Sequence, residues 1–453
     1  MAVLEKDYVV VGNSAAGVTA AEYLRANDPQ ARIAVVSREP YAAYGRPLIS
    51  YLIEGKTTED NMSLKPEGFY EANQIDALLG EEYEAVALDA RTQRVTLKNG
   101  DVLAYGKCLL ATGSIPFVPP IEGLADKRNV YTFITLDDAK ALEQAVFVAR
   151  DRAREQKRTC RVVVVGAGLI GLKAAESLRD HVDEVLVLEL APRILPAVLD
   201  DQGAEILRQL LEQRGIVCMP GISASEMLGD DNCINEVRLT NGQMVTCDVV
   251  VAAVGVRPNM ALALDAGVAC EKGIVCGTDM QTSAPNLYAA GDVTQVIDTL
   301  DGSRRPLALW PNAVRQGKCA GLFMAGSTKA VPFEGNFGVN AVDFFDVSLL
   351  TAGIINPPTD GGYEIKVFCS DESYAKFVVK DDRLFGYILL NRPANAGIYT
   401  ALIQQSFPLS KLSGDIFGET PLNLEFPREE RWARLHTCYP SDLDGRGWKE
   451  AQR

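Results

Sequence analysis

Two glycine-rich turns hold the residues of this 453-residue chain best suited to chemistry, and the second turn is the more complete. It lies in VVVVGAGLIGLKAAESL, where Gly166, Gly168 and Gly171 follow an apolar strand and open a helix. This spacing lets backbone amides approach a pyrophosphate, and the helix N-terminus adds partial positive charge. Glu189 ends the next apolar strand, about twenty residues on, where a carboxylate accepts hydrogen bonds from ribose hydroxyls. The pattern predicts a dinucleotide site that favours NAD(H), although Arg193 lies close enough to leave NADP(H) open.

The first turn, VVVGNSAAGVTAA, keeps Gly12 and Gly17 but has Ser14 where the middle glycine is expected. Serine is small, so it displaces a pyrophosphate only slightly, and its hydroxyl can donate a hydrogen bond. After the next strand, RIAVVS, Glu39 is the best candidate for the ribose hydroxyls. A single turn of this kind often reflects only tight packing of a helix on a strand. Two such turns in one chain indicate two dinucleotide sites.

The segments that follow the two turns repeat one another. TLKNGDVLAYGKCLLATGSIP covers 96–116, and RLTNGQMVTCDVVVAAVGVRP covers 238–258. Each is expected to form a strand, an Asn-Gly hairpin turn, a second strand and a buried strand that ends at a glycine. The interval from the Asn-Gly turn to that last glycine is the same in both segments. The chain therefore contains an internal duplication, which again predicts two nucleotide sites.

Composition and charge exclude several classes of function. With 60 acidic and 45 basic residues the formal net charge is −15, so a nucleic acid is not expected as a partner. His181 and His436 are the only histidines, too few for a zinc centre or a hydrolytic triad. The ten cysteines form no C-x-x-C or C-x4-C pair, which argues against an iron–sulfur cluster and for buried thiols in a reducing cell. Those expected to be buried include Cys108, Cys160, Cys247, Cys276 and Cys369.

No apolar run approaches the ~18 residues of a membrane span. The start, MAVLEKDYVVVG, runs directly into a strand and leaves no room for a signal peptide. The expected location is therefore the cytoplasm.

Four further motifs carry a resemblance to a known family. They are LLATGSIPFVPP at 109–120, AVGVRPN at 253–259, TSAPNLYAAGDV at 282–293 and WPNAVRQGKCAG at 310–321. In this order and spacing they resemble the FAD-dependent pyridine nucleotide–disulfide reductase superfamily. Within it the chain is most similar to NADH:rubredoxin or ferredoxin reductases, the flavin part of nitrite reductases and NADH oxidases, to about residue 410.

The resemblance implies that the first turn binds FAD and the second binds NAD(H). It also implies that Asp292 hydrogen-bonds the ribityl chain of FAD, and that Arg46 and Pro47, in YGRPLIS, pack on the flavin cofactor. The residues expected to bind the two cofactors are Gly12, Ser14, Ala15, Ala16, Gly17, Glu39, Arg46, Pro47, Val86, Ala111, Thr112, Gly113, Gly166, Gly168, Leu169, Ile170, Gly171, Glu189, Gly255, Gly291, Asp292 and Ala313.

The sequence departs from this family at two places. Where relatives carry one or two redox cysteines it reads PYAAYGRP, with Tyr41 and Tyr44 and no thiol. Disulfide, persulfide and cysteine-dependent peroxidase chemistry are therefore not expected.

The second departure is Lys173, which stands where relatives usually have a glutamate near the nicotinamide. Tyr51 stands where relatives have the lysine partner of that glutamate. As the candidate catalytic residue, Lys173 would place a cation near the flavin and stabilise its anionic reduced form. The alternative is a lysine that extends into solvent from the first helical turn.

The predicted fold is α/β, with two doubly wound Rossmann-like dinucleotide-binding domains, the NAD domain inserted in the FAD domain, and a C-terminal α+β interface domain. The expected boundaries are 1–116 and 251–329 for the FAD domain, 117–250 for the NAD domain, 330–425 for the C-terminal domain and 426–453 for a polar tail. A helix at 141–160, a strand at 161–165, and an antiparallel meander followed by a helix at 395–406 are expected. The tail, with Trp432 and Trp448, is a flexible end or a docking arm.

The sequence thus predicts an FAD-dependent NAD(H) oxidoreductase without a redox disulfide and without a metal site. Its flavin would exchange electrons with an external iron–sulfur carrier protein, such as a ferredoxin or rubredoxin, or with a subunit of a larger redox complex. The direction of electron flow and any homo-oligomer stay open. The alternatives are an NADH oxidase that reduces oxygen, and a flavin-bearing structural or sensing subunit.

Overall fold

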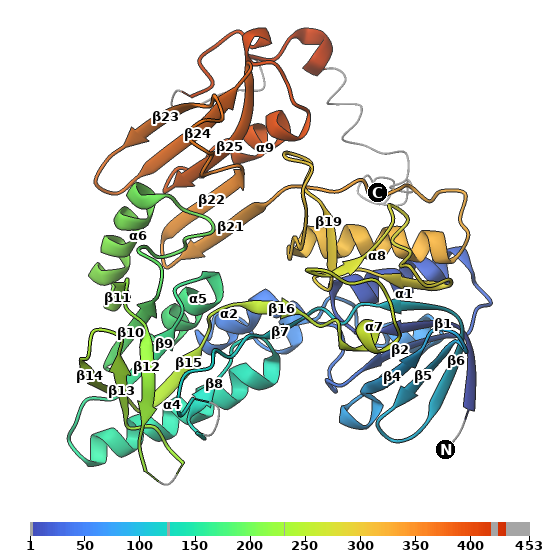
Figure 1. Ribbon diagram of the computed structural model, residues 1–453, viewed down its shortest axis with the longest axis horizontal. Helices are drawn as coiled ribbons and strands as arrows, with labels where there is room; N and C mark the ends of the chain where they lie inside the picture. Colours follow the sequence, from blue (N-terminus) through green and yellow to red (C-terminus); the bar gives the residue numbers. More distant parts are fainter. Residues whose placement is uncertain (1–2, 125–126, 231, 418–424, 432–453) are drawn as a thin grey trace, which may run out of the picture. The chain divides into compact units, whose positions relative to one another are not determined.

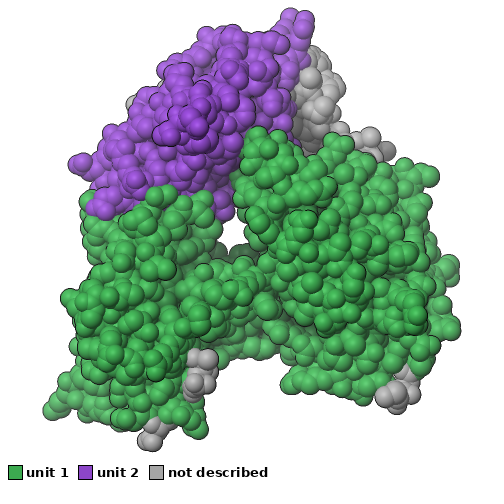
Figure 2. All heavy atoms as spheres, in the orientation of Figure 1, with its two compact units in different colours: residues 1–197, 207–338 green, residues 198–206, 339–453 purple. Residues whose placement is uncertain are grey.

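The computed structural model of the chain describes residues 3–124, 127–230, 232–417 and 425–431 (Figure 1). These residues form two compact units (Figure 2). Unit 1 comprises 1–197 and 207–338, and unit 2 comprises 198–206 and 339–453. The predicted polar tail lies mostly outside the described residues.

The first sheet of unit 1 has the strand order β3-β2-β1-β6-β5-β4, and β18 also pairs with β6. Its parallel strands are β1 (Val3–Val11), β2 (Ile33–Ser37), β3 (Ile75–Leu79), β6 (Val102–Leu110) and β18 (Leu287–Ala289). The antiparallel strands β4 (Ala85–Asp89) and β5 (Arg94–Leu97) complete it. The C-terminal ends of β1 and β6 and most of β2 are continuous buried apolar runs, since a parallel sheet covered on both faces buries successive side chains.

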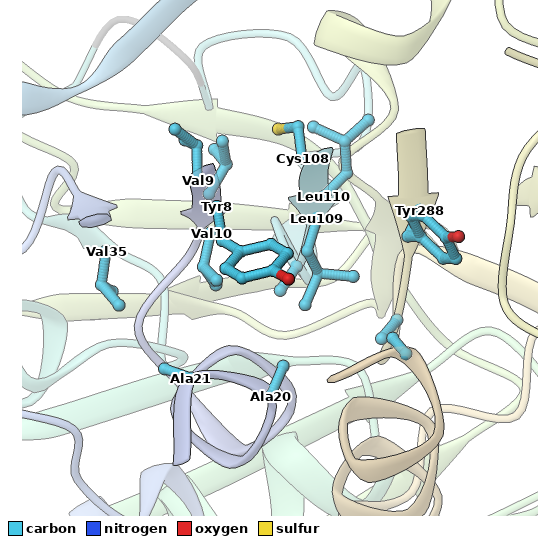
Figure 3. Packing of buried hydrophobic residues seen from close by; sticks show 14 of the residues in the cluster. Tyr8, Val9, Val10, Ala20, Ala21, Val35, Cys108, Leu109, Leu110 and Tyr288 are labelled. Atoms are coloured by element: carbon cyan, nitrogen blue, oxygen red, sulfur yellow. The ribbon is translucent and has the colours of Figure 1, made fainter. Parts of the chain in front are cut away.

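Two helices pack together beside this sheet, α1 (Ala15–Asn27) and α8 (Trp310–Met324). Figure 3 shows Val9 and Val10 of β1 beside Leu109 of β6, with Ala20 and Ala21 of α1 directed at the sheet. Because these alanines are small, α1 approaches the sheet closely. The packing brings the N-terminus of α1 to the carboxyl end of β1, where the first glycine turn lies.

The second sheet of unit 1 is entirely parallel, with the order β11-β10-β9-β15-β8. Its strands are β8 (Val130–Tyr131), β9 (Arg161–Val165), β10 (Glu184–Glu189), β11 (Ile216–Pro220) and β15 (Val249–Ala252). An antiparallel sheet of β12 (Ala224–Leu228), β13 (Glu236–Leu239) and β14 (Met244–Thr246) accompanies it. The helices of this region are α4 (Leu136–Glu155), α5 (Leu169–Leu178) and α6 (Asp201–Gln213).

The chain passes between the two parallel sheets twice, through a short antiparallel pair. Strands β7 (Ser114–Pro116) and β16 (Val256–Pro258) pair there, and the amide of Phe117 donates to the carbonyl of Gly255 at 2.9 Å. The second sheet is therefore inserted in the sequence of the first. This confirms the predicted α/β fold class with two parallel sheets.

Unit 2 contains an antiparallel sheet with the order β21-β22-β25-β24-β23. Its strands are β21 (Val339–Phe344), β22 (Val347–Gly353), β23 (Glu364–Cys369), β24 (Tyr374–Lys380) and β25 (Arg383–Leu390), followed by α9 (Ala396–Gln404). The predicted meander and C-terminal helix are confirmed. Cys369 was expected to be buried, and this was wrong: it lies on the edge strand β23 and is exposed.

The remaining elements are short. They are α2 (Ile49–Ile53), α3 (Phe69–Ala72), α7 (Ala261–Asp265), β17 (Ile274–Val275), β19 (Thr294–Ile297), β20 (Arg304–Arg305) and the 3-10 helices Arg46–Leu48, Asp60–Met62, Glu81–Tyr83 and Leu409–Lys411. None of the described helices is long and apolar enough to cross a membrane. The described His, Cys, Asp and Glu side chains form no group of three or more that could hold a metal ion.

Two local predictions need correction. The helix expected at 141–160 begins earlier, because Thr135 caps it in a capping box with Asp138, and it ends at Glu155. In the first repeat, the second hairpin strand and the buried strand are one continuous strand, β6. In the second repeat they are separate, as β14 and β15, with Cys247 and Asp248 between them.

Candidate functional site

The two glycine turns have the same backbone geometry. Gly12 has φ +116° and Gly166 has φ +107°, values that favour glycine. A Cβ atom at Gly12 would lie 2.1 Å from the carbonyl oxygen of Ala111, and one at Gly166 would lie 2.5 Å from that of Ala253. Both turns therefore require glycine at this position for the same two reasons, a positive φ and a backbone contact.

The last glycine of each turn serves close packing of the helix. A Cβ atom at Gly17 or Gly171 would lie 1.9 Å from the carbonyl oxygen of the first glycine of its own turn. The middle position is different. A Cβ atom at Gly168 would meet no atom within 4 Å, and the equivalent Ser14 is the N-cap residue of α1. The side of the turn that a pyrophosphate would approach is thus open at Gly168.

The N-termini of α1 and α5, whose N-cap residues are Ser14 and Gly168, are not capped by a side chain. Neither has a side-chain capping hydrogen bond, and within the described chain neither carries an acidic residue in its first turn. By contrast, α4 has the Thr135 capping box together with Asp137 and Asp138. Uncapped amides and the helix dipole attract an anion, so both termini fit a dinucleotide pyrophosphate.

Asp292 lies where β18, α1 and α8 meet. A Cβ atom at Gly291 would lie 3.1 Å from Cβ of Ala16 and 3.8 Å from Cβ of Ala313. The Gly291 amide donates to Oε1 of Gln316 at 2.8 Å, which fixes this turn against α8. Burial raises the pKa of Asp292, and the positive charge of Arg46 partly offsets that rise. A half-buried carboxylate beside the N-terminus of α1 fits a group that accepts hydrogen bonds from a sugar-like chain.

Glu39 is buried and bound by side chains. Tyr44 donates its hydroxyl to Oε2 of Glu39 at 2.6 Å, and Arg46 forms an ion pair with Oε1. The amide of Leu136, at the start of α4, donates to the Tyr44 hydroxyl oxygen at 2.9 Å. Burial raises the pKa of Tyr44, so this hydroxyl keeps its proton. The two oxygens of Glu39 are therefore already engaged.

Glu189 is bound by the backbone instead. Its Oε2 accepts from the amide of Ala167, inside the glycine turn, and its Oε1 accepts from the amide of Ala191, both at 2.8 Å. Nearby, Nη2 of Arg193 lies 3.5 Å from the carbonyl oxygen of Pro196. The turn itself thus orients the carboxylate that the sequence assigns to the ribose.

Lys173 is largely buried, with its side chain 15% exposed, so it does not extend into solvent. Its Nζ lies 2.5 Å from Oε2 of Glu176 and 3.8 Å from Oε1 of Glu54, on α2's C-terminal side. The ammonium also lies 4.9 Å from the centre of the Tyr51 ring. Two departures from the family pattern, Lys173 and Tyr51, are therefore neighbours.

The cysteines are unreactive where they are buried. Burial raises the pKa of Cys319 to about 11, and that of Cys160 and Cys276 to about 12. The described cysteines form no disulfide. The segment where relatives carry redox cysteines holds Tyr41 and Tyr44, whose rings pack edge to face.

The other predicted binding residues lie at the two glycine turns, at the crossing strands or in the 3-10 turn of Arg46, with one exception. Thr112 donates its hydroxyl to the carbonyl of Asn259 at 2.8 Å, and Gly113 and Gly255 flank the crossing strands. Val86 lies on β4 with 48% of its surface exposed, and nothing among the described residues links it to a glycine turn. The first-turn helix residues are Ala15, Ala16, Leu169 and Ile170, and Pro47 begins a 3-10 turn with Arg46.

Sequence analysis missed two groups at the first turn, Gln316 and the hydroxyl of Tyr44. Gln316 lies in the motif WPNAVRQGKCAG and is only 1% exposed. A glutamine on an apolar helix face was the available signal for it. No local pattern marks Tyr44, because its contact with the Leu136 amide joins distant segments and its contact with Glu39 lies in an irregular loop.

Comparison with known proteins identifies the family. Residues 6–317 match the family model described as pyridine nucleotide-disulphide oxidoreductase. The chain belongs to this family. It is an oxidoreductase of the NAD(P)H-dependent flavoprotein type, whose members typically bind FAD and NAD(P)H.

Individual family members agree with this assignment. The chain is 35% identical to the NADH oxidase of Methanocaldococcus jannaschii over 325 residues, which is 70% of each protein. It is 29% identical to the nitrite reductase [NAD(P)H] of Bacillus subtilis, covering 90% of this chain but 48% of that protein. The chain thus spans about half the length of this second relative. The reductase in the covalent putidaredoxin reductase–putidaredoxin complex matches with a TM-score of 0.80 and 26% identity, over 95% of this chain and 98% of the other.

Proposed function

We propose that this chain transfers electrons between NAD(H) and an external iron–sulfur carrier protein through bound FAD, without a redox disulfide. The observation that carries the proposal is the replacement of the family's cysteine segment by Tyr41 and Tyr44, beside a first turn shaped for a dinucleotide. Because this segment has no thiol to accept electrons from the flavin, the electrons pass directly from the flavin to the external acceptor. The predicted domain boundaries are part of this proposal, and so are the predicted site residues other than Val86 and Glu39.

Each cofactor has its own set of residues in this proposal. The first turn, Arg46 and Asp292 hold FAD. The second turn and Glu189 hold NAD(H), and the negative charge of Glu189 disfavours a 2′-phosphate. When bound, FAD accepts or returns a hydride and can release electrons one at a time. The residues of the chain orient the two ligands and exclude water between them.

Lys173 is proposed to place a cation on the NAD side of the reaction site. Glu176 and Glu54 balance its charge in the structure. We expect Lys173→Met to lower the flavin midpoint potential and to slow reduction by NADH. An unchanged potential and an unchanged rate of hydride transfer would show that Lys173 has only a structural role.

The relatives support two acceptors. The putidaredoxin reductase complex is a reductase bound to its carrier protein, which favours the iron–sulfur carrier. The NADH oxidase of M. jannaschii favours oxygen as a second candidate. Because nitrite reductase is about twice as long as the matched part, a subunit role in a larger redox complex is a third arrangement. A cytoplasmic location and the oligomeric state stay predictions.

The test uses the FAD-loaded protein, under anaerobic conditions for reduction by NADH and in air for turnover. Stopped-flow absorbance should show rapid bleaching of the flavin by NADH, and turnover with oxygen alone should be slow and accelerate on addition of a ferredoxin or rubredoxin. Rapid oxygen consumption with NADH alone would favour the oxidase. Slow or absent bleaching by NADH would overturn the proposal in favour of a structural or sensing subunit.

A further inference from the structure

The carboxylate of Glu39 follows β2 by two residues and that of Glu189 ends the equivalent strand β10, but the two have different partners. Backbone amides of Ala167 and Ala191 hold Glu189, whereas the side chains of Tyr44 and Arg46 hold Glu39. We propose that Glu39 is a positioning residue that fixes Arg46 and Tyr44 at the first turn, rather than an acceptor for ribose hydroxyls. This inference rests on the proposed FAD site.

Burial and charge support the assignment. Glu39 has a side chain 10% exposed, against 33% for Arg46. A buried carboxylate needs a partner, and removing that partner leaves an uncompensated charge. Arg46 supplies the compensation and stays partly exposed, so its guanidinium is the group of the pair that a ligand can reach. Glu39 is the inner member that holds it.

Arg46 is also held by the backbone. Its Nη1 lies 3.4 Å from the carbonyl oxygen of Ile134, just before α4. Its positive charge partly offsets the rise that burial causes in the pKa of Asp292. The orientation of Arg46 is therefore determined by the carboxylate of Glu39 and the carbonyl of Ile134.

Tyr44 extends the same network to α4. Its hydroxyl donates to Glu39 and accepts from the amide of Leu136, so one buried oxygen joins the end of β2 to the start of α4. Tyr41 makes a separate contact with this helix, since its hydroxyl donates to Oδ1 of Asp137 at 2.5 Å. Tyr41 thus offers a matched control: it is a tyrosine bonded to the same helix but not to Glu39.

Electrostatics explain why a carboxylate near the first turn would be paired with an arginine. A pyrophosphate is anionic, so an unpaired carboxylate close to the first turn would oppose its binding. Pairing Glu39 with Arg46 removes that opposition, and the N-terminus of α1 remains free of acidic side chains in its first turn. In the second turn Glu189 takes two amide hydrogen bonds instead, which leave its negative charge in place for discrimination against a 2′-phosphate.

The experiment is a double-mutant cycle on FAD affinity. Apoproteins of Glu39→Gln, Arg46→Gln and the double variant are titrated with FAD, and the dissociation constant is read from flavin fluorescence. We expect each single variant to weaken binding about tenfold and the double variant to be no weaker than Arg46→Gln alone, because interacting residues are not additive. The visible spectrum of bound FAD should change in the same way in both single variants.

Tyr44→Phe tests the network without altering charge. It should weaken FAD binding about threefold, and that effect should vanish in the Glu39→Gln background, whereas Tyr41→Phe should change affinity less than about twofold. Additive losses for Glu39→Gln and Arg46→Gln would overturn the inference and assign Glu39 a direct contact with FAD. If wild-type apoprotein fails to bind FAD, the proposed function itself fails. Thermal melting of each apoprotein confirms that the variants are folded.

Discussion

The two glycine turns share a backbone and differ in the side chains around it. In both, the first glycine has a positive φ and a carbonyl in contact, and the last glycine packs its helix on the turn. Around the second turn, backbone amides orient Glu189. Around the first, a side-chain network from Glu39 to α4 surrounds the turn, and Asp292 comes from a strand far along the chain.

This difference shows how a duplicated unit acquires two tasks. The turn geometry is set by glycine and by helix packing, so both copies keep it. Around the first turn, Asp292 and the start of α4 come from outside the repeat, whereas Glu189 of the second copy comes from within it. We expect the first site, with more elements around it, to hold its ligand tightly, and the second to exchange its ligand.

The largest effects should come from the first glycines. Gly12→Ala and Gly166→Ala each force a side chain into a positive φ and against a backbone carbonyl, so each should cost about 2–4 kcal/mol of the free energy of unfolding. Gly12→Ala should also lose FAD, whereas Gly166→Ala should keep the flavin but lose reduction by NADH. Chemical denaturation of the apoproteins and flavin absorbance measure the two effects. Loss of flavin from Gly166→Ala alone would contradict the separation of the two sites.

The next largest effect should distinguish the roles of the two carboxylates, Glu189 and Glu39, in nucleotide binding. Glu189→Ala should raise the KM for NADH about tenfold and reduce the preference for NADH over NADPH by a similar factor, because the ribose acceptor and its repulsion of a 2′-phosphate are lost together. Steady-state kinetics with both nucleotides measure the ratio. Glu39→Gln is the matched comparison, since it should weaken FAD and leave the nucleotide preference unchanged. An unaltered preference in Glu189→Ala would remove the second site's assignment to NAD(H).

A smaller effect concerns the stability of the first site. Burial raises the pKa of Asp292, so the folded apoprotein holds this proton more tightly than the unfolded chain. Its contribution to stability therefore falls as the pH rises above the ordinary carboxyl range near about 4. Asp292→Asn should melt at a higher temperature than wild type at pH 7, and the difference should shrink as the pH is lowered toward 4. The variant should bind FAD more weakly, and equal melting temperatures at all pH values would refute the burial argument.

The fold and the two turns could be predicted because they depend on local patterns. The apolar run before each turn gives a buried parallel strand, and the strand predicted at 161–165 is β9 without change. The start of α4 was missed, although Thr135 and Asp138 form a capping box, because the apolar pattern alone suggested a later beginning. The exposure of Cys369 was missed because alternation within β23 does not reveal that the strand is at a sheet edge.

The site could be predicted less fully, since its side-chain contacts, whether near or far in sequence, follow no periodic pattern. Glu39 was selected by its position after a strand, which says nothing about Tyr44 or Arg46 being its partners. The resemblance paired the positions of Lys173 and Tyr51, and the structure adds that the ammonium lies 4.9 Å from the centre of the Tyr51 ring. Such contacts depend on how α2 packs on α5, and no spacing within one segment encodes that.

The smallest effects should come from the middle position of each turn. Gly168 has open space where a side chain would stand and a φ of −77°, so Gly168→Ser should leave stability unchanged within about 0.5 kcal/mol. If the turns are equivalent, a serine here should be tolerated as Ser14 is, and the KM for NADH should rise no more than about threefold. The reciprocal Ser14→Gly should change FAD affinity by a similar factor. A loss of NADH binding of a hundredfold or more in Gly168→Ser would mean that the pyrophosphate lies closer to the second turn than to the first, and that equal backbones do not imply equal ligand positions.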